Sequence, residues 1–277
     1  MKTVLFLLAI TLTLNTVAQK NNAKVVLTKG QKILVKTTST QEADMGMGME
    51  MKNFSTMENK LVVIAASDAS ATITNTLTGV KLSMDLMGQS TTYDSDKKED
   101  SASEIGKTMQ DLNQPDTFIL NKYIATVTAN KKEVPVLTEQ ANPVEGMFQA
   151  LGNNKDNLVE HAFFLIPKDK KPGDKWEDST ITKDVKSYSN YFLKSIDKGI
   201  ATIAVDGKVQ NNTQTEMQGM QVTVNMAMTS TTEINVDTNT GNVKKRDAKA
   251  DITGTLEMMG QSLPVTGKGT SLTTYEY

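Results

Sequence analysis

The stretch MGMGMEM, from Met45 to Met51, places four methionines at every second position. In an extended strand this spacing turns all four thioethers to one side, and thioethers suit a soft metal ion such as Cu(I). A two-residue hairpin turn within the stretch would instead put Met45 on the face opposite Met49 and Met51, whereas an odd-length loop keeps them together. We favour packing at a hairpin tip or pocket rim, where methionine is an adaptable apolar filler, over a metal site.

Other residue types that could do chemistry are scarce. His161 is the only histidine and there is no cysteine, which excludes a zinc site of several histidines and all thiol chemistry. No nucleophile-elbow pattern marks a serine partner for His161, and no acidic pair marks a general acid and base. The sequence DTNTG at 237–241 begins like a calcium loop but lacks the terminal carboxylate, so it predicts a hairpin turn. We expect no enzyme, no catalytic residue, no metal site and no cofactor.

The first 18 residues have the layout of a secretory signal peptide. Position 2 is a lysine, an apolar run extends from Val4 to Leu14, and short residues precede Gln19. The run is too short for a transmembrane helix, and no later apolar run is long enough for one. No cysteine follows that could carry a lipid anchor. We therefore expect a soluble, exported chain, periplasmic or extracellular, that starts near Gln19.

The charge of the chain argues against nucleic acid as a partner. Without residues 1–18, which contain one lysine, 29 of the 30 basic side chains remain against 32 acidic ones, a net charge of −3. Arg246 is the only arginine, so the planar fork that reads bases and phosphates is almost absent. Disulfides are excluded as well, and the chain must be stabilised by burial alone.

The composition predicts a mainly β protein. The chain has 37 threonines and only six prolines, and its clearest segment, 220–236, alternates strictly. One face of that segment is apolar except at Ser230 and Thr232. Its apolar members are Met220, Val222, Val224, Met226, Met228, Ile234 and Val236. Strands of this length must twist, so we expect long antiparallel strands in a curved sheet or incomplete barrel, with Gly79 and Gly254 marking bulges.

A repeat divides the chain into two related halves. Glycines in Met/Gly/Gln motifs recur from 48 to 219 and from 88 to 260, at offsets of 171 and 172, and the turn glycines Gly30 and Gly199 are offset by 169. Nearly equal offsets predict one β half at 24–95 and a second at 189–277 within a single domain, 19–277.

The central region, 96–188, differs from both halves. Ser103 as a cap, followed by an apolar stripe of Ile105, Met109 and Leu112, predicts one short helix. The segment 142–152, with Pro143 near its start, predicts a second. We expect HAFFLIP, 161–167, to form a buried strand with His161 at its end, and Trp176 to begin the next strand as a core anchor.

Several of these features together resemble a family of uncharacterised exported bacterial envelope proteins. They are the signal peptide, a P-G-D-x-W element (Pro172, Gly173, Asp174, Trp176) and β-rich halves with Met/Gly/Gln hairpin tips. The resemblance spans most of the mature chain and implies no activity or catalytic residues. The expected architecture is similar to half-barrel lipoprotein carriers that shuttle acyl chains across the periplasm, although this chain has no lipidation cysteine.

These observations favour a non-enzymatic envelope protein that binds a lipid or other hydrophobic ligand on a concave apolar sheet face. The expected ligand-binding residues are Met49, Met51, Met220, Val222, Val224, Met226, Met228 and Met258. The alternatives are a structural or adhesive module with an envelope protein partner, in which the apolar faces bury each other, and soft-metal (copper) binding.

Overall fold

The computed structural model describes residues 24–44, 46, 50–86, 88–109, 112–129, 155–217, 220–258 and 261–277. The expected signal peptide at 1–18 and the expected helix at 142–152 lie outside these residues. Within them the chain forms twelve β-strands, two short α-helices and one 3-10 helix, and every strand pairing is antiparallel.

Most of the strands are long, since residues of alternating character continue through each hairpin arm. Their bounds are β1 (Lys32–Asp44), β2 (Glu50–Ala66), β3 (Ser70–Leu86), β4 (Gln89–Asp94), β5 (Pro115–Asn121), β6 (Thr126–Ala129), β7 (Lys175–Ile181), β8 (Val185–Asp197), β9 (Ile200–Met217), β10 (Met220–Asp237), β11 (Val243–Met258) and β12 (Gln261–Glu276).

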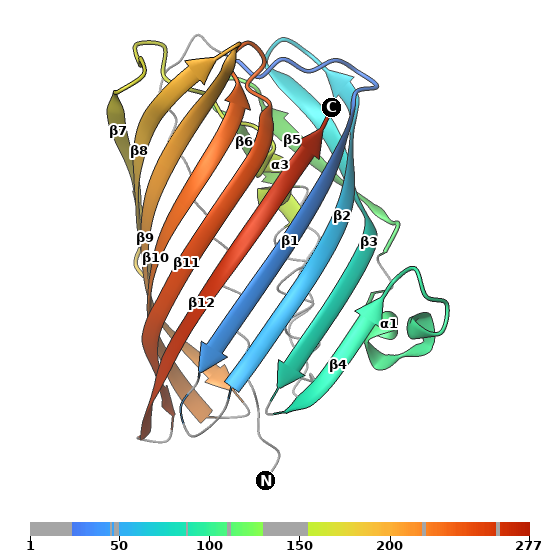
Figure 1. The fold of residues 1–277 in the computed structure, drawn as a ribbon, viewed down its shortest axis with the longest axis vertical. Helices are drawn as coiled ribbons and strands as arrows, with labels where there is room; N and C mark the ends of the chain where they lie inside the picture. Colours follow the sequence, from blue (N-terminus) through green and yellow to red (C-terminus); the bar gives the residue numbers. More distant parts are fainter. Residues whose placement is uncertain are drawn as a thin grey trace.

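All twelve strands belong to one curved sheet that does not close (Figure 1). Its order is β6-β5-β3-β2-β1-β12-β11-β10-β9-β8-β7, with β4 beside β3. This confirms the predicted mainly β fold, with long antiparallel strands in a curved sheet or incomplete barrel. The first and last long strands, β1 and β12, pair in the middle of the sheet and join its two parts.

The two parts of the sheet are built alike. Hairpins β1–β2 and β3–β4 stand beside hairpins β11–β12 and β9–β10, and the strand starts of the two sets differ by 168 to 173 residues. The two parts differ at one strand position: β4 pairs with the Lys81–Leu86 end of β3, and β5 pairs with its Ser70–Thr76 end. Beside β3, two separate strands, β4 and β5, therefore occupy the position that the single unbroken strand β12 occupies beside β11. The topology agrees with two related halves, while the domain bounds stay a prediction.

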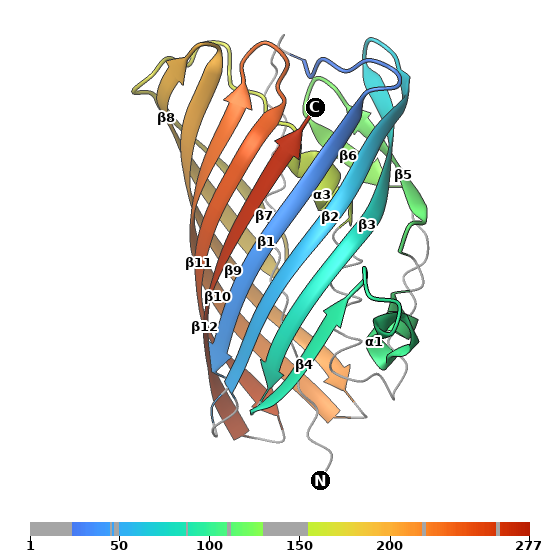
Figure 2. The ribbon, with the colours of Figure 1, turned by 45° about the vertical axis from the view of Figure 1, so that its right-hand side comes forward.

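All four of these hairpins turn at the same end of the sheet. We call this the tip end; the strand ends there are Asp44 and Glu50, Leu86 and Gln89, Met217 and Met220, and Met258 and Gln261. The opposite end, which holds the first residues of β1 and β9, is called the core end. Both views show the sheet curling around its concave side, with α3 inside it near the core end (Figures 1 and 2).

The helices differ in part from the expectation. Helix α1 (Glu104–Thr108) follows the 3-10 helix η1 (Asp100–Ala102), and the Ser103 hydroxyl accepts a hydrogen bond from Gly106 N at 3.0 Å, as the predicted cap requires. Ile105 is buried against β3 and β4. Helix α3 (Lys155–His161) was not predicted, and the strand predicted at 161–167 is wrong, because His161 ends a helix and only Phe163 forms an isolated bridge. Short apolar runs fit a buried helix end as well as a strand.

The Pro-Gly-Asp sequence forms the turn before β7, the strand that contains Trp176. Asp174 N donates to the Lys171 carbonyl at 2.9 Å, and Gly173 at φ 99° takes the position that a non-glycine residue avoids. The next strand then begins at Lys175, and the Trp176 ring stacks on Tyr191 with centroids 5.2 Å apart. The predicted anchor at the start of this strand is confirmed.

The main core lies between the concave face and α3 at the core end. Ile33, Leu61, Leu193 and Ile203 are fully buried there, together with Val159 of α3. None of the described helices is long and apolar enough to cross a membrane.

The two glycines expected at bulges behave differently. The register between β2 and β3 shifts at Glu58/Asn59, beside Gly79, which confirms that bulge. Gly254 instead pairs regularly with Met226, so the bulge expected there is wrong. A Cβ at Gly254 would lie 2.2 Å from the Asn225 carbonyl oxygen and 2.4 Å from Met226 Sδ. Position 254 therefore requires glycine, because the Asn225 carbonyl and the Met226 thioether leave no room for a Cβ.

Replacing Gly254 tests this close contact. We expect Gly254→Ala to lower the free energy of unfolding by about 1–3 kcal/mol, since the new methyl group must displace backbone. Gly79→Ala is the matched control, because its Cβ would meet nothing closer than 3.5 Å. Urea unfolding of both variants measures the difference, and equal stabilities would contradict the assignment.

Candidate functional site

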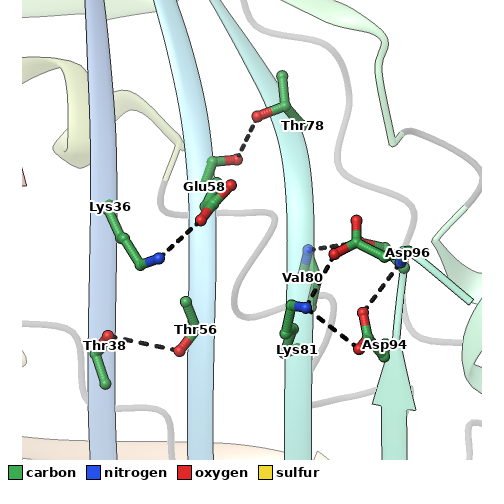
Figure 3. Close-up of polar contacts among 10 residues, drawn as sticks. Lys36, Thr38, Thr56, Glu58, Thr78, Val80, Lys81, Asp94 and Asp96 are labelled. Atoms are coloured by element: carbon green, nitrogen blue, oxygen red, sulfur yellow. Dashed lines mark hydrogen bonds and ion pairs between the residues drawn. The ribbon is translucent and has the colours of Figure 1, made fainter.

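Polar and apolar residues alternate along the strands, which gives the sheet one polar face toward solvent and one largely apolar face. On the convex face, exposed side chains pair across neighbouring strands: Lys36 Nζ lies 2.9 Å from Glu58 Oε1, and Lys81 lies 3.3 Å from Asp94 and 2.9 Å from Asp96 (Figure 3). Such exposed pairs add little stability, but they mark a face that meets water. The candidate site is therefore the concave face.

The structure places the predicted site residues as follows. Val224, Met226 and Met228 are buried on the concave side of β10, and Met51 is buried on β2. Met220, Val222 and Met258 lie at the tip end of β10 and β11, where Val222 pairs with Met258. Met49 lies outside the described residues.

Apolar residues form rows across the concave face toward the tip end. In the first row, Met51 of β2 is separated from Met228 of β10 by three strands that contribute Ala43, Gly267 and Ile252. A second row contains Met226, Gly254 and Val265. In a third, Val224 of β10 and Leu263 of β12 lie on either side of β11, both paired with position 256. We call these three rows the apolar rows. Sequence reading missed their β11 and β12 members because glycines interrupt the alternation there.

A row of small and polar residues borders the apolar rows on their core side. Direct pairing carries it across eight strands, from β2 to β7. We call it the polar row; its members are Asn53, Gln41, Gly269, Ala250, Ser230, Gly207, Ser189 and Asp178. The next row toward the core end is similar in its middle, where Ser39 and Ser55 share a hydrogen bond of 2.7 Å and lie beside Ser271, Ala248 and Thr232.

The two ends of the concave face are covered to different degrees. At the core end, Ile33, Ile203 and Leu193 are 0% exposed, and in the apolar rows Val224, Met226 and Met228 are buried as well. Ile252 and Leu263 of the apolar rows, by contrast, are only half-buried. Among the described residues, the atoms nearest to a Cβ added at Gly267 or Gly269 belong to the neighbouring strand β1.

The only arginine and the only histidine meet where α3 lies on the sheet. Arg246 points inward from β11, and its Nε donates to the His161 carbonyl at 2.9 Å. That carbonyl is at the last turn of α3, where it has no partner within the helix, and the positive charge suits the helix C-terminus. Tyr277 OH donates to the Ala162 carbonyl at 2.8 Å. Together these contacts fix α3 to the core end.

Burial sets the protonation of this cluster. Burial, and secondly the nearby Arg246 charge, lower the pKa of His161 to about 3, so the imidazole is neutral at pH 7. Burial raises the pKa of Tyr275 to about 12, and the hydrogen bond to Arg246 opposes that rise. No carboxylate of the described residues raises the pKa of His161. This pKa is too low for a general base that works near neutral pH.

Most of the methionine stretch that suggested a metal site belongs to the connection between β1 and β2, which has an odd number of residues. Asp44 pairs with Glu50, so residues 45–49 form the connection between β1 and β2. Asp44 Oδ1 accepts a hydrogen bond from Gly46 N at 2.8 Å. Met45 and Met49 lie outside the described residues, and the described ones contain no cluster of three His, Cys, Asp or Glu side chains that could hold a metal ion.

The pKa of His161 predicts an acid sensitivity. As pH falls from about 6.5 to about 3, the unfolded chain binds a proton on this imidazole while the folded chain does not, so stability is lost in that window and is complete above it. Between pH 7 and pH 5 this loss is at most about 2 kcal/mol. We expect His161→Gln to remove it, measured by urea unfolding at both pH values. An equal loss in both proteins would contradict the prediction.

Comparison with solved structures places the fold. A structure reported as "Lipid-protein interactions in lipovitellin" matches with a TM-score of 0.50 at 11% identity, covering 91% of this chain and 26% of that one. The chain thus spans about a quarter of the length of that protein. DynF from Micromonospora chersina (TM-score 0.23, 10% identity, 95% and 90% coverage) and an outer membrane channel from Pseudomonas putida F1 (0.26, 8%, 91% and 97%) match more weakly.

Comparison with protein families assigns the chain by sequence. No curated protein matches the chain. One family model matches residues 68–243, from the β2–β3 turn to the start of β11, and thus more than half of the chain. The chain belongs to this family, which is described as a family of unknown function (DUF6263).

Proposed function

We propose that this is a non-enzymatic protein of the cell envelope, exported to the periplasm or beyond, that binds a lipid or other hydrophobic ligand on its concave sheet face. The observation that carries the proposal is the set of apolar rows, in which Ile252 and Leu263 are only half-buried. Apolar side chains left half-buried on a concave face give a hydrophobic ligand a surface to contact.

The size of the face fits an acyl chain. From Met228 to Met220, strand β10 runs roughly 27 Å at the usual rise of a strand. One leaflet of a bilayer holds acyl chains in about 15 Å of hydrocarbon. The apolar rows cover roughly the first 13 Å of this length, from Met228 to Val224. A single chain can therefore begin on the apolar rows and extend along β10 toward the tip end.

The residue types also suit a ligand of variable shape. Met51, Met226 and Met228 present flexible thioethers, which adapt to irregular apolar partners better than branched side chains do. The likeness to the lipovitellin structure, which was reported for its lipid–protein interactions, concerns the fold; it supports the proposal by analogy only.

The test is lipid extraction from the full-length protein, purified from its own envelope under mild conditions, followed by mass spectrometry. We expect a co-purifying lipid in the unaltered protein. Ile252→Glu places a charge in the first apolar row and should reduce the bound lipid at least about tenfold, because an unpaired charge is costly against an apolar chain.

Thr253→Glu is the matched control. It adds the same charge to the next residue of β11, on the exposed convex face, and should leave the bound lipid unchanged. Unaltered protein that carries no lipid and binds none on addition would contradict the proposed function. A protein partner captured in its place would favour a structural or adhesive module.

A further inference from the structure

The polar row is the feature of the concave face that an apolar ligand alone does not explain. It borders the apolar rows on one side and the row of Ser39 and Ser55 on the other, and each of its eight members comes from a different strand. On the convex side of the same strands, the flanking residues Lys52, Lys208 and Asn190 are exposed. The row is thus an interior feature of the sheet.

One acceptor in this row has no partner. Asn53 is 9% exposed, and its Oδ1 makes no hydrogen bond to any residue that the structure describes. A buried polar atom without a partner is costly, and native structures usually satisfy it with a protein group, a water or a ligand. An amide oxygen requires a donor, so a ligand group that satisfies it must carry N–H or O–H.

The charges around the row select against an anionic group. Neither the polar row nor the row on either side of it contains a lysine or arginine among the described residues, and Asp178 adds a carboxylate. The nearest inward cation on β11 is Arg246, four residues from Ala250 or roughly 13 Å along the strand. Its guanidinium is bonded to the His161 carbonyl and to Tyr275. An ionised carboxylate at the polar row would therefore lack a cationic partner.

The row also offers room. Ala250 has a small side chain and Gly269 has none, and a Cβ at Gly269 would meet only the Thr40 carbonyl oxygen and Gln41 Cγ within 4 Å among the described residues. Gly207 offers no such room, because Ser230 Oγ lies 2.5 Å from where its Cβ would be. A hydroxylated group can thus approach the sheet between Asn53 and Ser230 without displacing a large side chain.

We propose that the polar row binds the uncharged, hydroxyl-bearing end of a single-chain lipid, of the monoacylglycerol class, whose chain lies on the apolar rows toward the tip end. The inference rests on the proposed function and adds the class and the orientation of the ligand: hydroxyls toward Asn53, the chain toward Met226 and Val224.

The experiment compares three probes of equal chain length on the full-length protein: monooleoylglycerol, oleate and octadecene, each measured by displacement of a fluorescent apolar dye. We expect monooleoylglycerol to bind most tightly. Asn53→Leu should weaken its binding about tenfold while changing octadecene by less than about twofold, as loss of one buried hydrogen bond predicts.

Three further variants keep the test decisive. Asn53→Ser retains an acceptor and should preserve the preference. Asn190→Leu makes the same change as Asn53→Leu on the exposed convex face and should change nothing. Ala250→Leu places an apolar side chain in the row from another strand and should also reduce monooleoylglycerol binding, which covers the case in which Asn53→Leu does not fold.

The outcomes separate the two proposals. If none of the probes binds, the proposed function itself is wrong. If all bind equally, or oleate binds most tightly, the proposed function stands and the assignment of the polar row is overturned. A loss of octadecene binding equal to that of monooleoylglycerol in Asn53→Leu would likewise overturn it, because it would show a structural role for Asn53.

Discussion

The pairing of β1 with β12 is the interaction on which the rest of the sheet depends. It joins residues 34–44 to residues 266–276 in an unbroken antiparallel register, and it places the first long strand of the chain beside the last. The first apolar row, the polar row and the rows nearer the core end pass through this pair, so a slip of one residue here would turn the inward residues of one part outward. With no disulfide to hold the ends, this register rests on strand hydrogen bonds and on the burial of residues such as Val35 and Tyr275.

The composition of the polar row is hard to explain by stability. A central sheet position that faces the interior favours β-branched and aromatic residues, and glycine weakens a strand. The row instead has glycines on β9 and β12, and an asparagine whose amide oxygen has no partner among the described residues. The polar row thus departs from these preferences at several neighbouring strands. Such local departures are most often found where a protein binds something.

The sequence predicted single strands well and the relations between strands poorly. The alternation that starts at Met220 identified β10 almost to the residue. A strand with one buried and one exposed face shows this directly as alternating apolar and polar residues. Ser230 and Thr232 stood out as exceptions in that pattern. Their partners Gly207, Ala250 and Ala248 come from strands β9 and β11, and no local signal shows which residues will lie opposite. The error at His161 has another cause: the tertiary contact with Arg246, distant in sequence, fixes the end of α3, and the short apolar run after it fits a helix end or a strand equally well.

Arg246 belongs to the core end of the concave face. It is the one described arginine, it faces inward, and at first sight it suits an anionic ligand. Its Nε is bonded to the carbonyl at the end of α3 and its guanidinium to Tyr275, both on the side of the core end. To meet a carboxylate at the polar row it would have to leave these partners, and the last carbonyl of α3 would lose its cap. The same side chain therefore closes the core end and leaves the polar row without a cation, which disfavours an anionic group there and suits an uncharged hydroxyl group that donates to Asn53.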